Sequence, residues 1–276
     1  MRNAFRDFFR RRRVKRHFAR NGNVFSYHGL SVEVPASTGI GLCNALLRNK
    51  YEASEAAMIL AYLPPNVPVI ELGGSLGIVS RLVRSRLRAD IRHLVLEANP
   101  EIIDVCRGNA LRGAPPGMSE VLNAALFHDA KVVEFKLGHE IHNNSLYGDG
   151  LHCRLVKVPA VTLADLLERI GTPEHFVLIS DIEGGEFAIF EHEAALLSRL
   201  TVGIIELHPR IYGSMGRSEA ELLDLCAASG LEVMDRRHNV IVIRPVPRRA
   251  GKSLALVEGL NRDDNRIDEV GAAHRK

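Results

Sequence analysis

The chain has 276 residues, of which 46% are apolar and 25% charged, enough to bury a sizeable core in one large domain. Its formal charge of +3 is unevenly distributed: residues 1–20 carry nine Lys or Arg against one acid, and residues 246–276 carry seven against five. Residues 21–245 therefore have a net charge of −7. Because an acidic domain repels a phosphate backbone, we expect no nucleic-acid partner.

The two ends of the chain are expected to lie outside the chemistry. Residues 1–23 form a basic arm, which would place Phe5, Phe8 and Phe9 on one face if it were helical. A frayed, solvated arm is the simpler prediction, and reversible contact with an anionic membrane surface is the alternative. Residues 246–276 mix charges and lack aromatic side chains, which predicts a disordered tail.

Cysteine usage and hydropathy indicate the compartment. The four cysteines stand far apart, with neither a Cys-x-x-Cys pair nor zinc-ligand spacing, so a reducing compartment fits best. The basic N-terminus is not followed by an apolar segment, and no later run approaches the roughly 18 apolar residues of a membrane span. We therefore expect a cytoplasmic protein, with peripheral contact to the inner face of the membrane as the alternative.

Short apolar runs alternate with amphipathic stretches through residues 24–245, which is typical of strands and helices around a parallel sheet. The predicted strands, in chain order, cover residues 67–72, 93–97, 121–126, 132–137, 155–161, 175–180, 201–207, 231–235 and 239–245. Helices are predicted after the first strand to about Arg88, from Asn99, from the cap residue Thr162, and over about residues 218–229. Only three residues separate the last two strands, too few for a parallel crossover, so we predict an antiparallel hairpin.

The strongest local signal is the segment from Glu71 to Gly77, where a strand ends in an acid and turns through glycines into a helix. Gly73 and Gly77 allow the backbone to approach a ligand closely, and the start of the helix offers unpaired N–H groups. Glu97 ends the next strand, 20 residues beyond Gly77, where an acid can accept both hydroxyls of a ribose. The pattern predicts an adenosine-bearing ligand.

Glu71 discriminates between such ligands. Its carboxylate would repel a pyrophosphate and attract a cationic sulfonium and an α-amino group, which favours S-adenosylmethionine (SAM) over NAD. Position 75 is Ser and no third glycine falls in place, so the dinucleotide fingerprint is missing from the sequence. An NAD-dependent oxidoreductase is therefore the weaker alternative.

Several segments together resemble the FkbM family of SAM-dependent methyltransferases. They are, in chain order, YEASE (51–55), VIELGGSLG (69–77), LEANP (96–100), NAAL (123–126), VTLADLL (161–167), SDIEGGEFAIF (180–190) and IIELHP (204–209). The resemblance covers residues 24–245 and implies an α/β, Rossmann-like class I methyltransferase with a mostly parallel seven-stranded sheet. It also implies O-methylation of a hydroxyl on a sugar, glycolipid or small metabolite. Together with the glycine turn it assigns cofactor binding to Glu71, Gly73, Gly74, Ser75, Gly77, Glu97, Ala98, Asn99, Ala124 and Ala125.

The chain departs from the family pattern in two places. The first motif has Glu71, Gly74 and Ser75 where Asp, Ala and Asn are common, and Ser180 replaces the Lys that commonly precedes D-x-E-G. The first set of changes is conservative for cofactor binding. The missing Lys leaves open a second hypothesis, a catalytically silent adenosyl-binding module that docks on a membrane or a protein partner.

Candidate catalytic residues follow two predicted strands, at the edge where open parallel sheets bind ligands. Methyl transfer to an alcohol needs a positioned base, and we predict His208 or Asp181, because imidazole has a pKa near about 6.5 and the carboxylate could orient it or accept the proton. Glu183 and Glu206 would bind sugar hydroxyls; a divalent ion held by carboxylates is the less favoured alternative. Glu186 is equally compatible with an exposed salt bridge.

Acceptor specificity is expected in the loops around residues 25–50, 138–153 and 209–217. The second of these contains Asn143 and Asn144 in a polar stretch, which predicts a surface loop, with a substrate lid as the alternative.

Overall fold

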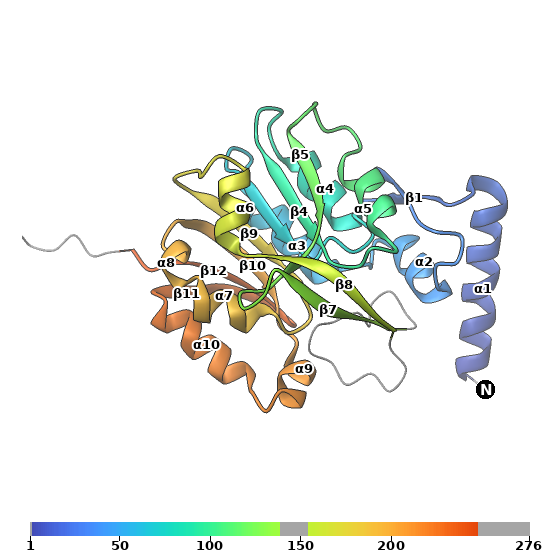
Figure 1. The fold of residues 1–276 in the computed structure, drawn as a ribbon. Helices are drawn as coiled ribbons and strands as arrows, with labels where there is room; N and C mark the ends of the chain where they lie inside the picture. Colours follow the sequence, from blue (N-terminus) through green and yellow to red (C-terminus); the bar gives the residue numbers. More distant parts are fainter. Residues whose placement is uncertain (1, 139–153, 248–276) are drawn as a thin grey trace, which may run out of the picture. The chain divides into compact units, whose positions relative to one another are not determined.

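A computed structural model describes residues 2–138 and 154–247 of the chain. Its centre is a seven-stranded sheet (Figure 1), with the spatial order β11 (Leu231–Arg237), β12 (Val240–Pro245), β10 (Leu200–Glu206), β9 (Phe176–Ser180), β3 (Val69–Leu72), β4 (His93–Glu97) and β5 (Ser119–Asn123). Neighbouring strands are parallel except that β12 runs antiparallel to both β10 and β11. The predicted mostly parallel sheet with an antiparallel C-terminal hairpin is confirmed.

Helices cover both faces of this sheet (Figure 1), as an α/β fold requires. In chain order they are α1 (Arg2–Asn21), α2 (Ile40–Leu46), α3 (Ala53–Tyr62), α4 (Ile78–Arg86), α5 (Ile103–Ala110), α6 (Leu163–Arg169), α7 (Glu186–His192), α8 (Ala194–Leu197), α9 (Pro209–Ser214) and α10 (Glu219–Ala228). Helices α3 and α4 pack on one face, and α6, α7, α8 and α10 on the other. Along β9, Val177 and Ile179 face the first core while Phe176 and Leu178 face the second, the alternation of a strand buried on both sides.

The helix ends follow local signals closely. Thr162 caps α6 in a capping box, in which its hydroxyl accepts from the Asp165 N–H at 3.1 Å and the Asp165 carboxylate accepts from the Thr162 N–H at 2.8 Å. The Ser218 hydroxyl caps α10 by accepting a single hydrogen bond from the Glu221 N–H at 3.2 Å. The helix predicted to reach about Arg88 ends at Arg86, and the one predicted to open at residue 99 begins at residue 103, after a turn.

Two smaller sheets accompany the central one. β1 (Val24–Tyr27) and β2 (Leu30–Glu33) form a hairpin, and β8 (Arg154–Val161) pairs with β6 (Ala125–Leu126) and β7 (Val132–Leu137). Residues 25–50 and 209–217, expected as loops, therefore contain β1, β2, α2 and α9. The other expected loop, with Asn143 and Asn144, lies largely outside the described residues, as does the predicted tail from residue 248.

The single strand predicted over residues 121–126 is wrong, because the chain leaves the central sheet at Ala124. The Asn123 side-chain amide donates to the carbonyls of Glu97 and Ala98, at 2.8 and 3.1 Å, and the Ala124 N–H donates to the Glu97 carbonyl at 3.2 Å. These bonds tie the bend to the carboxyl end of β4. Ala124 and Ala125 are thereby held at the edge of the sheet where ligands bind.

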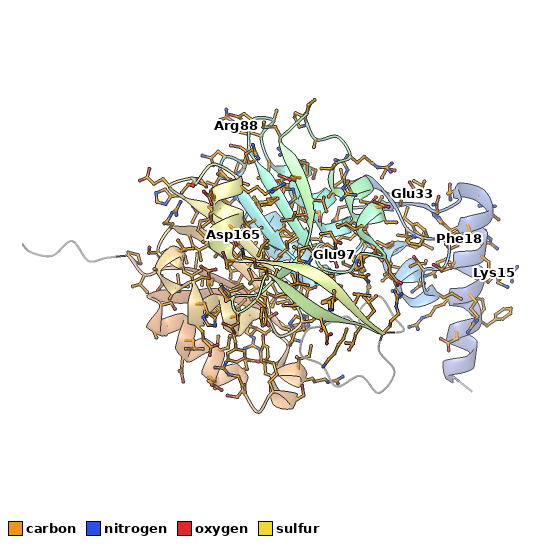
Figure 2. All side chains as sticks on the ribbon, in the orientation of Figure 1. Lys15, Phe18, Glu33, Arg88, Glu97 and Asp165 are labelled. Carbon is orange, nitrogen blue, oxygen red and sulfur yellow. The ribbon has the colours of Figure 1, made fainter. Side chains whose placement is uncertain are left out.

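The basic N-terminal segment is a continuous helix packed on the domain, so the prediction of a frayed arm is wrong. Val14 of α1 is only 3% exposed, and Phe18, one turn further, packs against the same core (Figure 2). The rings of Phe18 and Phe25 meet edge to face at 5.7 Å, and the Arg13 guanidinium donates to the Asn44 side chain at 3.2 Å. Among the described residues, none of the helices has both the length and the apolar character of a membrane span.

Strand order in the central sheet reverses at β3, because the next strand, β4, lies on one side of it and β9 lies on the other. Leu72, the last residue of β3, is level with Leu96 of β4 and with Ser180 of β9. Open α/β sheets bind ligands in the crevice that such a reversal leaves at the carboxyl ends of the strands.

Candidate functional site

The turn after β3 joins the ends of three strands. The N–H groups of Gly73 and Gly74 both donate to the Leu96 carbonyl, at 2.9 and 3.0 Å, and the Asp181 N–H donates to the Leu72 carbonyl at 2.9 Å. Gly73 has a φ of 89°, and a Cβ at this position would lie 1.9 Å from the carbonyl oxygen of Asp181. Only glycine permits this approach, which sets the Asp181 loop beside the turn.

A cavity opens at this edge of the sheet, with about 760 Å³ of empty space when the part open to solvent is included. Of the predicted cofactor-binding positions, those that line it are Gly73, Ser75, Glu97, Ala98, Ala124 and Ala125. The predicted catalytic residues Asp181 and Glu183 line it as well. The structure therefore brings eight predicted residues from four separate segments of the chain into one cavity.

Gly74 and Gly77 have a packing role instead. A Cβ at Gly74 would lie 2.5 Å from Cγ1 of Val95, and one at Gly77 would lie 2.3 Å from the carbonyl oxygen of Cys106 on α5. Neither glycine is among the residues that line the cavity. Their absent side chains let α4 and α5 approach the turn closely.

The carboxylate of Glu97 is fixed by two backbone donors. The Ser75 N–H donates to one oxygen and the Asn99 N–H to the other, each at 2.6 Å. Glu97 is 7% exposed, and its burial raises the pKa of the carboxyl to about 7 against the opposing effect of those hydrogen bonds. Because each carboxylate oxygen has a further lone pair, Glu97 can still accept hydrogen bonds from a ligand. Asn99 itself does not line the cavity.

Glu71 lies beneath the turn and away from the cavity. It is 2% exposed, and its carboxylate oxygens accept from the Ser80 hydroxyl at 2.5 Å and from Nε2 of His93 at 2.8 Å. Both oxygens are therefore engaged inside the protein. The structure contradicts the predicted contact between Glu71 and a cofactor, and the preference for a cationic ligand has to rest on other carboxylates.

His208 lies between two carboxylates. Its Nε2 is 3.1 Å from Oδ1 of Asp181, and its Nδ1 is 3.0 Å from Oε1 of Glu186. Glu186 is fully buried and also accepts from the Tyr212 hydroxyl at 3.2 Å, so the alternative of an exposed salt bridge at Glu186 is wrong. A neutral imidazole has a single N–H, whereas the protonated ring donates to both neighbours.

The charge state of His208 follows from these contacts. Burial disfavours the imidazolium, but the hydrogen bonds to Asp181 and Glu186 outweigh it and raise the pKa of His208 to about 11. The ring is therefore protonated at neutral pH and has no lone pair with which to take a proton. The structure contradicts the prediction that His208 is the base; its contact instead positions the carboxylate of Asp181.

Several glutamate carboxyls in and beside the cavity have raised pKa values. Burial is the main cause, and it raises the pKa of Glu52 and of Glu183 to about 7. Glu206, at the end of β10, does not line the cavity, yet burial and the charge of Asp181 raise its pKa to about 8. A cation entering here would favour the ionised carboxylates, so this acidic half of the site suits a positively charged group.

A divalent metal ion held by these carboxylates is the alternative hypothesis from the sequence. Within residues 2–138 and 154–247, no three or more His, Cys, Asp or Glu side chains are grouped so that they could hold a metal ion.

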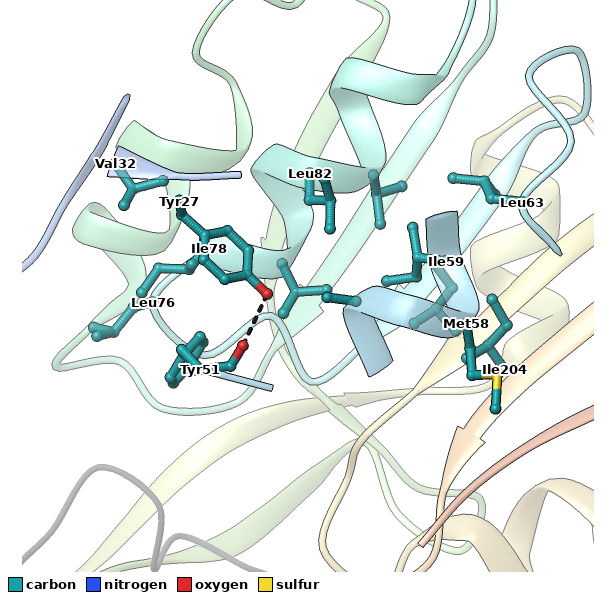
Figure 3. Close-up of a cluster of buried hydrophobic side chains, with 14 of the residues drawn as sticks. Tyr27, Val32, Tyr51, Met58, Ile59, Leu63, Leu76, Ile78, Leu82 and Ile204 are labelled. Carbon is teal, nitrogen blue, oxygen red and sulfur yellow. Dashed lines mark hydrogen bonds between the residues drawn. The ribbon is translucent and has the colours of Figure 1, made fainter. Parts of the chain in front are cut away.

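Sequence reasoning assigned no role to Tyr51 and Glu52, which both line the cavity. Tyr51 is 6% exposed, and its carbonyl accepts from the Tyr27 hydroxyl at 3.0 Å, which anchors this segment to a buried cluster (Figure 3). Glu52, Ser75 and Glu183 each combine a positive φ with a place in the cavity wall. Such strain in non-glycine residues concentrates at functional sites. The sequence signal for these two residues is the YEASE segment, which contributes to the family resemblance but does not indicate what either residue does.

Ser180 stands where the family commonly has Lys. It is fully buried in β9, and its hydroxyl has no hydrogen-bond partner in the part of the chain that the structure describes. It does not line the cavity. The side chain at the position that departs from the family pattern therefore takes no part in the cavity wall of this protein.

The chain matches one family model and is similar to several solved structures. A family model described as the methyltransferase FkbM domain matches residues 77–236. A TehB-like SAM-dependent methyltransferase from Corynebacterium glutamicum is similar, at 12% identity and a TM-score of 0.39, over 70% of this chain and 87% of that one. An O-methyltransferase from Bacillus cereus in complex with SAH is similar at 15% identity and a TM-score of 0.41, over 68% of this chain and 77% of that one. No curated protein sequence matches the chain.

Proposed function

We propose an O-methyltransferase function on the premise that this chain belongs to the FkbM methyltransferase family, whose domain matches residues 77–236. SAM, the methyl donor of this class, would donate its methyl group to a hydroxyl of a sugar, a glycolipid or a small metabolite. One observation carries the proposal: Glu97 and the carboxylates of Asp181 and Glu183 line the same cavity at the reversal point of the sheet. In this proposal a site for ribose hydroxyls and a site for an acceptor hydroxyl would lie next to each other.

The walls of the cavity fit SAM in their chemistry. Glu97 would accept hydrogen bonds from the ribose hydroxyls, and the apolar side chains of Ile102 and Leu126 would enclose the adenine ring. Glu52 and Asp181 supply the negative charge that a sulfonium and an α-amino group require, the role first predicted for Glu71. When bound, SAM supplies an activated methyl group.

The acceptor hydroxyl would be held and deprotonated by the 181–183 loop. Asp181 is fixed by the imidazolium of His208, and its side chain stays 28% exposed, so its carboxylate can accept a hydrogen bond from the hydroxyl. Glu183 lies 4.0 Å from the same imidazolium, and its pKa of about 7 matches the neutral range in which a general base works best. In this proposal Glu183 would accept the hydroxyl proton as the methyl group passes to the acceptor oxygen; the bond between the methyl carbon and sulfur would break, and neutral S-adenosylhomocysteine would leave.

A label-transfer assay tests the proposal. The protein is incubated with SAM carrying an isotopic methyl label and a panel of sugars, glycolipids and phenols, beside amine analogues of the same compounds. We expect label in an ether linkage on one class of hydroxyl acceptor. Glu183→Gln should lower the rate by about 10² to 10⁴, whereas the exposed Glu174→Gln, which makes the same chemical change away from the cavity, should not.

The alternatives give different results in the same assay. Label only on the amine analogues would replace O-methylation with N-methylation. SAM binding by calorimetry without transfer to any acceptor would favour the silent adenosyl-binding module.

A further inference from the structure

From residue 7 onward, where its side chains are described, helix α1 packs on the domain through one side. Val14 and Phe18 form its buried contact, and Arg13 adds a hydrogen bond to α2. An α-helix turns by about 100° per residue, so Arg12 and Arg16, each two residues from Val14, lie about 160° around the axis from it. The face that these arginines occupy is therefore the one directed away from the domain.

This outer face is strongly basic. All seven Lys and Arg side chains from residue 7 to residue 20 are exposed, against a single acid, Asp7, in the same stretch. Arg10 pairs with that acid at 3.6 Å. The cations on α1 stand in contrast to the net charge of −7 carried by residues 21–245. The helix is thus a cationic element on an acidic domain.

Two large aromatic side chains lie among these cations. Phe8 is 58% exposed and Phe9 is 46% exposed, and their rings meet edge to face at 5.6 Å. Phe9 is nine residues from Phe18, which places it about half a turn out of phase with the buried side of the helix. Exposed rings of this size beside Arg and Lys are characteristic of helices that lie in a membrane interface.

Charge and apolarity together select the occupant of this face. A second copy of α1 would bring like charges together. The phosphate backbone of a nucleic acid would extend past the ends of α1, where the neighbouring acidic domain would repel it. A bilayer rich in anionic lipid offers negative head groups for the arginines and an apolar layer for the two Phe rings, while the domain remains in water.

We propose that the outer face of α1, formed by Phe8, Phe9, Arg12 and Arg16, docks this protein reversibly on an anionic phospholipid surface. The helix lies along the interface: the Phe rings enter the boundary between head groups and acyl chains, and the Arg side chains pair with lipid phosphates. The proposal does not depend on the O-methyltransferase function, because it concerns a surface outside the cavity.

Vesicle sedimentation with the full-length chain tests it. We expect binding to vesicles of phosphatidylcholine mixed with phosphatidylglycerol, loss of binding as salt is raised, and none to phosphatidylcholine alone. Arg12→Gln with Arg16→Gln should weaken partitioning about 30-fold, since each basic residue near an anionic surface contributes roughly fivefold. Phe8→Ser with Phe9→Ser should weaken it by at least about tenfold. Because all four side chains are exposed, the variants should keep the unfolding temperature of the parent protein.

A charge-matched control separates the helix from net charge. Arg86→Gln with Arg237→Gln removes two exposed cations from other elements and should leave partitioning unchanged. The proposal is overturned if anionic vesicles fail to bind the parent protein, or if this control loses as much binding as the α1 variants. It is also overturned if single-stranded RNA binds more tightly than the vesicles at equal ionic strength through the same four residues.

Discussion

The Nε2 atom of His208 lies 3.1 Å from Oδ1 of Asp181, and this contact turns a residue with the usual properties of a base into a fixed cation. The cation is held from its other side by Glu186, which is fully buried. A permanent positive charge at this place orients Asp181 and lowers the pKa of Glu183 relative to burial alone. In the proposed function the proton-accepting role therefore falls to Glu183, which lines the cavity.

The pH dependence of His208→Asn distinguishes positioning from base catalysis. We expect a loss of about 10- to 100-fold in kcat, because Asp181 loses its partner. The rising limb of the pH–rate profile, set near pH 7 by Glu183, should persist and move to higher pH, since the imidazolium no longer lowers that pKa. A steady-state profile from pH 5.5 to 9.5 measures this.

Two companion variants sharpen the test. Glu183→Gln should remove the limb altogether, and Tyr212→Phe, which takes one donor from Glu186, should leave its position unchanged. If the rising limb of the pH–rate profile disappears in His208→Asn and survives in Glu183→Gln, the general base is His208.

Glu97 offers a test of the adenosine site. Glu97→Ala removes the acceptor proposed for the ribose hydroxyls and also frees the N–H groups of Ser75 and Asn99. We expect SAM and S-adenosylhomocysteine to bind about 10²- to 10⁴-fold more weakly, because two hydrogen bonds to a charged group are lost in a buried place. Calorimetric titration measures both affinities. Glu101→Ala, an exposed acid in the same turn, is the control and should bind normally; equal affinities for Glu97→Ala and the parent would refute the assignment.

A structural feature of this protein can be predicted from the sequence when the interactions that cause it join residues close together in the chain. The turn after β3, the caps of α6 and α10, and the C-terminal hairpin follow from short-range rules, and the structure has all of them. The role of Glu71 depends on His93, 22 residues away, which draws the carboxylate inward. The charge of His208 likewise depends on Glu186, whose burial no local pattern indicates.

Contacts between residues distant in the chain also explain where β5 ends and why α1 is ordered. The bend at Ala124 follows from side-chain bonds that Asn123 makes to the neighbouring strand, and these exist only once the sheet has formed. Helix α1 is ordered by Phe25, which supplies the apolar partner that Phe18 lacks in the isolated segment. Long-range contacts of this kind cannot be read from periodicity.

The affinities for SAM and S-adenosylhomocysteine should depend differently on pH, because ionisable glutamates line one half of the cavity. The sulfonium of SAM favours the ionised forms of Glu52 and Glu183, whose pKa values are about 7, whereas the neutral sulfur of the product does not. We expect the ratio of the two affinities to rise about tenfold in favour of SAM between pH 6 and pH 8.5. Calorimetry in two buffers of different ionisation enthalpy should show proton release with SAM only. A ratio that stays flat would place the sulfonium away from these acids.

Raised pKa values also predict that the protein without ligand loses stability as pH rises. The pKa of Glu206 is raised from 4.5 to about 8 and that of His208 from 6.5 to about 11. Folding therefore favours the protonated form of each, so their contribution is complete below the unfolded-state pKa and is lost as pH rises through the folded-state value. The unfolding temperature should fall by several degrees from pH 6 to pH 9. Glu206→Gln, which mimics the protonated acid, should regain about 3 °C at pH 9 and less at pH 6, while Glu174→Gln should follow the parent curve. A curve that stays flat would mean that these groups ionise as freely in the folded protein as in water, and a curve that rises with pH would mean that the unfolded chain binds more protons than the folded protein.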